Sequence, residues 1–410
     1  MKKTVQRLIL ILGFVTTFSA HAANFDGKVE EWTGKPGEKF SDAEANFKLV
    51  MKRLRENYVD KNLAEEDLYR AATAGMLAAL NSGKENENWN VLLSPRMLED
   101  FMVEKTGKLT GIGATLEFEP KTGTARVLAV LPDSAALKAG LKNDDEILSV
   151  NGEKYKGKTL ADMVAMIRGP SGKVVHLKVL REDRILNFDI ARNSVKLLEL
   201  ESTLIEPGTG LLTIGFFSTE TSSLVSKKLE SLAREKIKKL VVDLRGNSGG
   251  TFDDAVKVGE LFLPKGKLIV RTKERDGKVT EYTSHREAWH PEVQLVVLTD
   301  KYTASGAELL TGALRNGRSA MVIGQTTKGK WNAQSLETLP NKFAIKYSVL
   351  KFESEDGKDY QGVGLKPDLE IDGPSGALLG NLQSETNLKK RINQDPPLKA
   401  AIEVAMHAQS

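Results

Sequence analysis

The strongest constraint on the fold of this chain is an alternation of strand-like and helix-like segments between residues 197 and 371. Apolar runs typical of strands lie at 211–217, 239–244, 293–299 and 320–323, with helical patterns between them at 222–234, 253–262 and 307–315. This alternation is typical of an α/β sheet with crossover connections. A strand pattern at 343–352, followed by the turn Glu355-Asp356-Gly357, indicates an antiparallel ending. We therefore predict an α/β core at 195–373.

A second compact region precedes this core, at 107–194. Its strand-like runs lie at 114–118, 125–130, 146–150, 174–180 and 185–190, with short helices expected at 134–139 and 160–167. Turn signals such as Asn151-Gly152 separate these segments. Five strands and two helices in so short a stretch predict a small, partly open β-barrel.

Helical patterns flank these two regions. Within an N-terminal helical region at 23–106, apolar residues recur at helical spacing between 41 and 80, after the capping-box-like start Ser41-Asp42-Ala43-Glu44. A C-terminal extension at 374–410 carries helical patterns at 388–392 and 398–406. These last helices either close the structure or meet a partner.

The first 22 residues have the features of a secretory signal peptide. A basic start with Lys2, Lys3 and Arg7 precedes an apolar run at 8–18 that is too short to span a bilayer comfortably. Ala20-His21-Ala22 is an A-x-A cleavage site, so we expect export to the periplasm and cleavage near Ala22. The alternative is an uncleaved N-terminal anchor. No later segment is apolar enough to predict a membrane span.

Composition narrows the function further. The 410 residues carry a net charge of +4, and the basic start of the signal accounts for most of it. This balance argues against nucleic acid as a partner, because such proteins concentrate basic residues on one face. The chain has no cysteine, which excludes a disulfide framework, a lipid-modified N-terminal cysteine and a thiol nucleophile.

Ser305 is the candidate nucleophile. It lies in Thr303-Ala304-Ser305-Gly306, between the apolar run at 293–299 and a helical pattern. A hydroxyl at a helix N-terminus is favourably placed, since the positive end of the helix dipole favours a developing oxyanion. The simpler interpretation is that Ser305 only caps the helix.

Lys330 and Gln334 give Ser305 a chemical context. An ordinary lysine has a pKa of about 10.4 and is a poor base at neutral pH. Burial beside apolar groups lowers that pKa, so a neutral Lys330 could accept the proton of Ser305. Gln334 could orient the amine through a hydrogen bond. The simpler alternatives are a solvated lysine and a water-facing polar strand residue.

A glycine-rich loop follows the strand at 239–244. Its backbone N–H groups can approach a substrate closely, so Gly249 or Gly250 could complete an oxyanion hole with the Gly306 amide. A phosphate-binding loop is excluded, because the spacing of its glycines is absent. The simpler interpretation is an ordinary βα turn.

The histidines give neither a triad nor a metal site. His285 and His290 are five residues apart, which does not put two ligands on one helical face. We therefore expect no metal and no cofactor.

Together these residues resemble the carboxy-terminal processing peptidases, also called tail-specific proteases. The resemblance covers roughly residues 40–372 and rests on Gly111-Ile112-Gly113, the segments 131–136, 139–141 and 144–152, Arg168-Gly169-Pro170, Asp243-Leu244-Arg245, Ser305, Gly329-Lys330 and Gln334.

The resemblance implies a crotonase/ClpP-like α/β protease core with an inserted PDZ domain. It implies that Ser305 is the nucleophile, Lys330 the general base and Gln334 its orienting partner. In the PDZ domain the loop amides of Gly111, Ile112 and Gly113 would hold a substrate's terminal carboxylate. Arg168 matches a position that links the two domains, which implies a ligand-gated site.

Some positions depart from the family pattern. Thr110 stands where a further glycine is usual, and the segment 85–90 replaces an Asp-Pro-His-Ser segment. Beside the base, Lys328 and Trp331 stand in a stretch that is usually Phe-Gly-Lys-Gly-Ser. These departures bear on substrate preference and gating.

The leading hypothesis is an exported serine endopeptidase that recognises the C-terminal tails of envelope proteins. Its partners would be proteins or peptides with accessible C-termini, with an adaptor protein and a homo-oligomer left open. A second hypothesis is a catalytically inactive PDZ adaptor on a protease scaffold. A third is an acyl-thioester enzyme, against which the export signal, the PDZ-like barrel and the Ser–Lys pair argue.

Overall fold

The computed structural model describes residues 41–60, 62–81, 89–105, 108–119, 124–130, 134–154, 160–196, 200–374, 377–383, 385 and 387–407. The expected signal peptide at 1–22 lies outside them, as do residues 131–133. The described residues divide into two compact units. One contains those of Glu99–Ala333 and Val349–Ser410, and the other those of Thr16–Leu98 and Gln334–Ser348.

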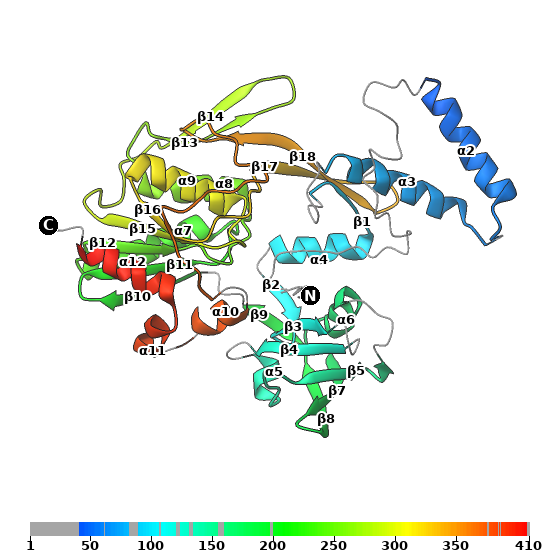
Figure 1. Cartoon of the computed structure of the whole chain (residues 1–410), viewed down its shortest axis with the longest axis horizontal. Helices are drawn as coiled ribbons and strands as arrows, with labels where there is room; N and C mark the ends of the chain where they lie inside the picture. The colour runs from blue at the N-terminus through cyan, green and yellow to red at the C-terminus, as the bar shows by residue number, and fades with distance from the viewer. Residues whose placement is uncertain are drawn as a thin grey trace, which may run out of the picture. The chain divides into compact units, whose positions relative to one another are not determined.

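The core of the first unit is a six-stranded sheet (Figure 1). Its order is β10-β11-β12-β15-β16-β19; β10 and β11 are antiparallel, and the remaining neighbours are parallel. The strands are β10 (Leu200–Glu206), β11 (Thr209–Ile214), β12 (Lys239–Asp243), β15 (Gln294–Thr299), β16 (Met321–Gly324) and β19 (Leu369–Glu370). The predicted α/β core with crossovers is therefore present.

Helices cover both faces of this sheet. One face packs against α7 (Thr221–Arg234), α8 (Phe252–Phe262) and α9 (Gly306–Arg318). The other packs against α12 (Pro396–His407), which follows α10 (Ala377–Gln383) and α11 (Leu388–Asn393). The helices expected at 388–392 and 398–406 are thus present, and α12 completes a three-layer core.

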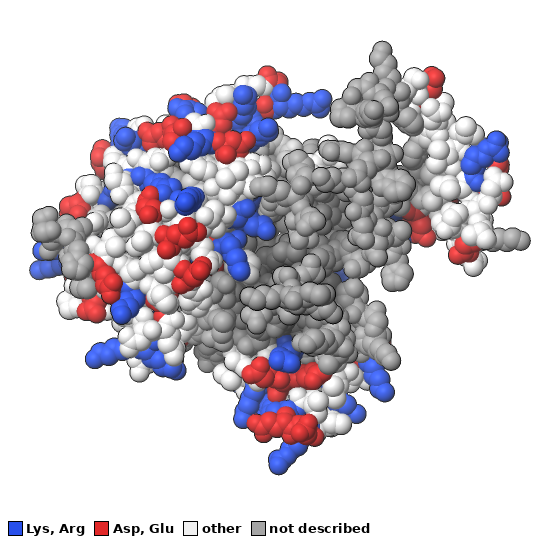
Figure 2. Space-filling model, in the orientation of Figure 1, with Lys and Arg blue, Asp and Glu red and all other residues white. Residues whose placement is uncertain are grey.

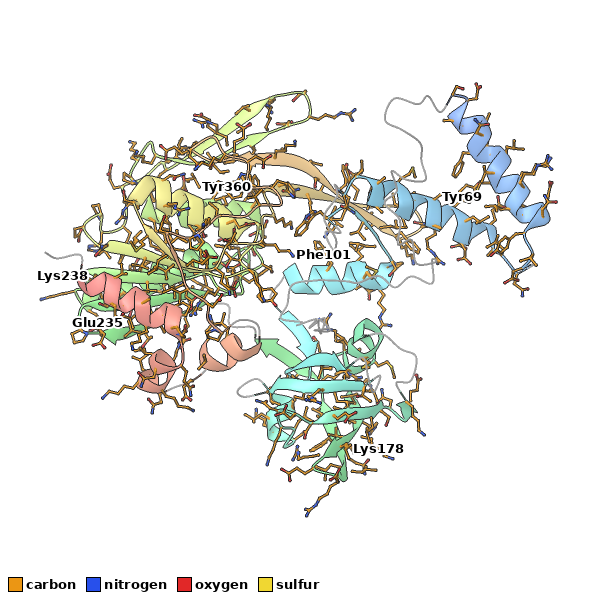
Figure 3. All side chains as sticks on the ribbon, viewed as in Figure 1. Tyr69, Phe101, Lys178, Glu235, Lys238 and Tyr360 are labelled. Atoms are coloured by element: carbon orange, nitrogen blue, oxygen red, sulfur yellow. The ribbon has the colours of Figure 1, made fainter. Side chains whose placement is uncertain are left out.

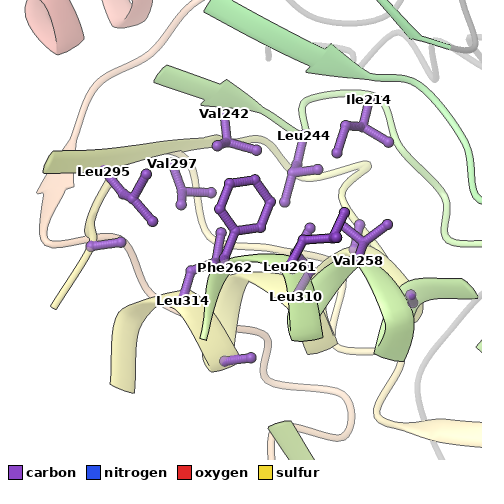
Figure 4. Packing of buried hydrophobic residues seen from close by; sticks show 14 of the residues in the cluster. Ile214, Val242, Leu244, Val258, Leu261, Phe262, Leu295, Val297, Leu310 and Leu314 are labelled. Atoms are coloured by element: carbon purple, nitrogen blue, oxygen red, sulfur yellow. The ribbon is translucent and has the colours of Figure 1, made fainter. Parts of the chain in front are cut away.

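The alternation of side chains along β12 shows why the sheet needs both layers. Val242 contributes to the α7–α9 side and Val241 to the α12 side, and both are fully buried. Figure 4 shows Phe262 of α8 among Val242, Val297 and other residues of the first side. A strand buried on both faces has a continuous apolar run, which is the pattern seen in the sequence.

A smaller antiparallel sheet was only partly expected. β13 (Leu268–Lys273) pairs with β14 (Val279–Thr283) and, at its end, with residues 351–353 of β18 (Ala344–Glu353). The strand β18 and the turn after it confirm the antiparallel ending, since Gly357 N–H donates to the Ser354 carbonyl. The β13–β14 hairpin was not predicted: its apolar run, Leu268 to Val270, is only three residues long, and polar residues dominate the rest of the hairpin.

The region at 107–194 has the predicted strands and helices. The order β3-β4-β5-β7-β8, with β6 beside β5, surrounds a compact apolar core, and α5 and α6 are the two expected helices. Their bounds are β3 (Ala114–Glu119), β4 (Thr124–Val130), α5 (Ala135–Lys138), β5 (Glu146–Val150), β6 (Glu153–Lys154), α6 (Leu160–Ile167), β7 (Val174–Arg181) and β8 (Arg184–Ala191). A separate ribbon pairs β2 (Lys108–Gly111) with β9 (Asn193–Lys196).

The second unit contains helices α2 (Ala43–Asn57) and α3 (Glu65–Ala79). It also contains β1 (Val91–Leu93), which pairs with residues 344–346 of β18, and part of β17 (Asn332–Thr338). Helix α4 (Pro95–Lys105) begins in this unit. The predicted capping box was wrong: Asp42, not Ser41, is the N-cap of α2, and its side chain makes no capping bond. Ser41 is thus one residue too early to reach the third residue of α2.

Candidate active site

Ser305 occupies a sharp turn between β15 and α9. It is the N-cap of α9, with φ 55° and ψ −119°. Residues other than glycine rarely adopt this conformation, which costs about 1–3 kcal/mol and persists only where the surroundings enforce it. A strained turn between a strand and a helix start is a geometry that can present a serine hydroxyl as a nucleophile.

The buried side chain of Asp300 supports this turn. Asp300 Oδ1 accepts hydrogen bonds from the N–H groups of Tyr302 and Thr303 and from Gly246 N–H of the glycine loop. Burial raises the pKa of Asp300. This carboxylate therefore fixes both loops at the carboxyl ends of β12 and β15.

The glycine loop lies against Ser305. Ala304 N–H donates to the Asn247 carbonyl over 2.9 Å. A Cβ on Gly249 would lie 2.8 Å from Ser305 Cβ and 3.1 Å from Gly306 N, so only glycine allows this approach. The Gly249 N–H itself donates to Asn247 Oδ1 at 2.8 Å.

The neighbouring Gly250 is oriented differently. Phe217 forms a parallel bridge with it, in which Phe217 N–H donates to the Gly249 carbonyl and Thr251 N–H donates to the Phe217 carbonyl. The N–H of the middle residue of such a bridge points away from the bridging strand. The Gly250 amide is thus turned away from Phe217.

Backbone hydrogen bonds hold Lys330 close to the turn that contains Ser305. We call residues 303–306 the nucleophile turn and residues 327–330 the base segment. Ser305 N–H and Lys330 N–H each donate to Glu308 Oε2 over 2.8 Å. The two nitrogens are therefore at most twice 2.8 Å apart. Lys328 N–H also donates to the Thr303 carbonyl over 2.9 Å.

The other side of the base segment packs on residues 360–364. Gly362 N–H donates to the Gly329 carbonyl over 2.7 Å. Trp331 N–H donates to Gln361 Oε1, and the Trp331 ring makes edge contacts with Phe352 and Tyr360. Trp331, which follows Lys330 in the sequence, is buried in the core and fills the space between the base segment and these two rings. Figure 3 labels Tyr360 on this side of the core.

Gln334 lies in the second unit. It belongs to β17, and its Nε2 donates to the Trp89 carbonyl over 2.6 Å. Trp89 is in the same unit.

The predicted PDZ-loop residues lie at the end of β2. Gly111 is the last residue of β2, and the carbonyl of the buried Ile112 accepts from Ala136 N–H of α5. Gly113 has φ 77°, and a Cβ on it would lie 2.3 Å from Ser134 Cβ. Glycine is thus required at Gly113 both by its backbone conformation and by the space available.

Arg168 and the buried Arg192 both lie at the C-terminus of α6. Arg168 N–H donates to the Val164 carbonyl. The Arg192 guanidinium donates to the carbonyls of Met166 and Ile167. A cation there complements the negative end of the helix dipole. Sequence reasoning missed Arg192, because no local pattern marks a residue 25 positions after a helix as its cap.

Sequence reasoning also missed Glu308, although its signal was present. Glu308 is three residues after Ser305, the spacing of a capping box. Burial raises the pKa of Glu308, and its carboxylate accepts four hydrogen bonds. Its link to the base segment was not visible in the sequence.

Two further properties concern the described residues alone. They contain no group of three or more histidine, aspartate or glutamate side chains arranged to hold a metal ion. No helix in the described part of the chain combines the length and apolar character needed to cross a membrane.

Comparison with known proteins identifies the family. The model of peptidase family S41 matches residues 208–371, and that of the PDZ domain matches residues 100–180. A carboxyl-terminal-processing protease of a Synechocystis species is 31% identical over 327 residues, covering 78% of this chain and 75% of that protein. The chain belongs to peptidase family S41.

Two other comparisons agree with this assignment. A Staphylococcus aureus protein named "Probable CtpA-like serine protease" is 30% identical over 326 residues, or 79% of this chain. The present chain spans 64% of the length of that relative. The solved photosystem II D1 C-terminal processing protease shares the fold, with a TM-score of 0.54 at 23% identity, covering 83% of this chain and 92% of that one. This chain is thus a multidomain α/β protein with a PDZ domain.

Proposed function

We propose that this chain is a serine endopeptidase of the carboxyl-terminal-processing type, with Ser305 as nucleophile and Lys330 as general base. The observation that carries the proposal is the shared Glu308 oxygen, which brings the backbones of Ser305 and Lys330 together at a strained helix start. Membership of family S41 and the names of its relatives support the same activity.

In the proposed reaction, Ser305 Oγ attacks the carbonyl carbon of the scissile peptide bond. Neutral Lys330 Nζ accepts the hydroxyl proton and passes it to the leaving amine as the C–N bond breaks. Water then attacks the acyl-enzyme and gives its proton back through Lys330, which frees Ser305. The reaction needs no cofactor. Gln334 is proposed to orient the amine.

The proposed oxyanion hole combines the Gly306 amide with that of Gly249 or Gly250. The N–H of Gly306 lies at the start of α9, where the helix dipole favours negative charge. The Gly249 N–H is engaged by Asn247 Oδ1, whereas the Gly250 N–H points away from Phe217. These contacts favour Gly250 as the second donor.

The proposed substrates are proteins or peptides with accessible C-termini. The loop of Gly111, Ile112 and Gly113 would hold the terminal carboxylate, and the tail would add a strand beside α6. The matched PDZ domain supports this proposal. Arg168, at the C-terminal end of α6, is proposed to couple tail binding to the active site, and an adaptor protein is a further proposed partner.

The proposed location is the periplasm, after cleavage of the signal peptide near Ala22, with no stable membrane span in the mature chain. Among the described residues on the face shown in Figure 2, acidic and basic side chains are interspersed and form no broad basic patch. This supports the proposal that nucleic acid is not a partner.

A homo-oligomer is proposed through α2 and α3. Both helices expose apolar side chains, including Val50 of α2 and Met76 of α3. Figure 3 labels the exposed Tyr69 on α3. The sequence of α2 has more basic than acidic residues, and that of α3 the reverse, so α2 of one copy complements α3 of another. Mass photometry of the mature chain tests this, and a monomer at micromolar concentration contradicts it.

We also propose the finer architecture that the resemblance implies. The peptidase core at 195–373 would be of the crotonase/ClpP type, with an inserted PDZ domain at 107–194, an N-terminal helical region at 23–106 and a C-terminal extension at 374–410. The three-layer arrangement around β12 supports this assignment.

The decisive experiment incubates the purified mature chain with a protein that carries an unstructured C-terminal tail. Cleavage by the wild type, and none by Ser305→Ala or Lys330→Ala at an unchanged melting temperature, supports the proposal. Tail binding without cleavage favours the catalytically inactive adaptor. Hydrolysis of an acyl-thioester but not of the tail favours the thioester enzyme.

A further inference from the structure

We propose that Glu308 is a positioning residue whose buried carboxylate holds the nucleophile turn and the base segment in one fixed arrangement. This inference rests on the proposed function, because it assigns Glu308 a role toward Ser305 and Lys330. The proposed function uses the Glu308 contacts only to show that Ser305 and Lys330 lie close together, whereas this inference makes Glu308 necessary for the rate.

Both oxygens of Glu308 are occupied, and the side chain is fully buried. Oε2 accepts from Ser305 N–H and Lys330 N–H, each over 2.8 Å. Oε1 accepts from Thr327 Oγ1 over 2.5 Å and from Gly329 N–H over 2.6 Å. Because no solvent-facing oxygen remains, Glu308 acts through the groups it holds and does not touch substrate.

Helix capping explains only one of these four bonds. In a capping box, the glutamate three residues after the N-cap accepts from the N-cap N–H, here that of Ser305. The other three donors belong to Thr327, Gly329 and Lys330, about twenty residues further along the chain. A role limited to helix stability leaves the convergence of the base segment on this carboxylate unexplained.

Thr327 extends the arrangement beyond the site. Its hydroxyl donates to Glu308 Oε1 and accepts from Leu365 N–H over 2.7 Å. The base segment is therefore fastened to Glu308 on one side and to residues 362–365 on the other. Loss of the carboxylate would remove three bonds on the first side and leave there the bond from Lys328 N–H to the Thr303 carbonyl. The contacts with residues 362–365 would then dominate, so the base segment would shift away from Ser305.

The chemistry of the side chain defines the test. Glu308→Gln keeps the shape of glutamate but replaces one acceptor oxygen with an NH₂ donor, so donors would face donors. Thr327→Val removes one donor with little change in shape, and Thr327→Ser restores it. Thr311→Val is a matched control, because the buried Thr311 hydroxyl donates to the Ala307 carbonyl within α9 and does not reach the base segment.

The experiment measures kcat and KM on a tailed peptide, the rate at which a fluorophosphonate labels Ser305, and the melting temperature. We expect Glu308→Gln to lower kcat and the labelling rate about 100-fold with KM nearly unchanged, because a small misplacement of reacting groups costs that much. Thr327→Val should lose roughly 10-fold, and Thr327→Ser should regain it. Thr311→Val should keep the wild-type kcat even where its melting temperature falls.

The outcomes separate the two proposals. If the wild type is active and Glu308→Gln keeps its kcat, this inference is wrong and the proposed function stands. If the wild type neither cleaves nor reacts with the fluorophosphonate, the proposed function fails and this inference fails with it. Where Glu308→Gln does not fold, the Thr327→Val and Thr327→Ser pair decides, and equal kcat values for those two variants contradict the positioning role.

Discussion

Arg245 and Asp395 form a buried ion pair across 150 residues of sequence. Arg245 begins the glycine loop, and Asp395 immediately precedes α12. The guanidinium donates to both oxygens of Asp395 and both oxygens of Asp243. Burial tends to raise the pKa of Asp243, but Arg245 outweighs it and the pKa lies below its usual value. The C-terminal helix is thus tied to the loop that lies against Ser305.

Asp395→Ala should therefore destabilise the fold strongly. It leaves the buried Arg245 with half of its partners, and breaking a buried pair in this way costs about 3–5 kcal/mol. Urea denaturation followed by tryptophan fluorescence measures this cost. Glu281→Ala is the control, because it breaks the solvent-exposed pair with Arg271 and should cost less than about 1 kcal/mol. Equal losses for the two variants would contradict a structural role for the pair.

Replacement of Ser305 should separate strain from chemistry. At φ 55° and ψ −119°, glycine fits without strain whereas alanine keeps the penalty. Ser305→Gly should thus be more stable than Ser305→Ala by about 1–3 kcal/mol, with both variants inactive. Thermal melts with parallel cleavage assays check this. An alanine variant as stable as the glycine variant would show that the turn stores no strain.

Gly249→Ala should damage both stability and activity. Its Cβ would meet Ser305 Cβ at 2.8 Å and the Ala304 carbonyl oxygen at 3.0 Å. Gly277→Ala is the control. Gly277 also has a positive φ, 87°, but an added Cβ there would have no atom within 4 Å. Melting temperature and kcat for the two variants isolate the steric effect. Activity retained in Gly249→Ala would argue against a close approach of this loop to Ser305.

Trp331→Gly should strongly destabilise the region around the base segment. Trp331 is 2% exposed and packs against Phe352 and Tyr360. Removal of such a side chain leaves a cavity and costs about 3–5 kcal/mol. Trp331→Phe should lose much less. Chemical denaturation of both variants gives the comparison, and a glycine variant as stable as the wild type is the contrary result.

Asp356 should contribute stability that is lost in acid. Partial burial tends to raise the pKa of Asp356, but hydrogen bonds from Ser354, Tyr360 and Lys358 lower it to about 2, below its ordinary value of 3.8. A depressed folded-state pKa stabilises the fold above the unfolded-state pKa and loses this effect as the pH falls toward 2. The melting temperature of the wild type should exceed that of Asp356→Asn at pH 6, and the difference should shrink between pH 4 and pH 2. A constant difference over that range would argue against this linkage.

Much of the fold could be predicted because local patterns carry it. The bounds predicted at 146–150 and 160–167 are those of β5 and α6, and the pattern at 239–244 differs from β12 by one residue. These segments have apolar periodicities that tertiary contacts reinforce. β11 ends at Ile214, three residues before the predicted end, because Phe217 leaves the sheet to bridge Gly250.

The sequence by itself determined the order of strands and helices, the α/β class of the core and the residue types that carry the proposed chemistry, including Ser305 and Lys330. Only the tertiary structure decided that Glu308 joins the backbones of these two residues, that Arg192 caps α6 and that α12 is the third layer of the core. The reason is physical. Periodicity reports the environment of neighbouring residues, whereas a buried hydrogen bond between distant segments depends on how the whole chain packs.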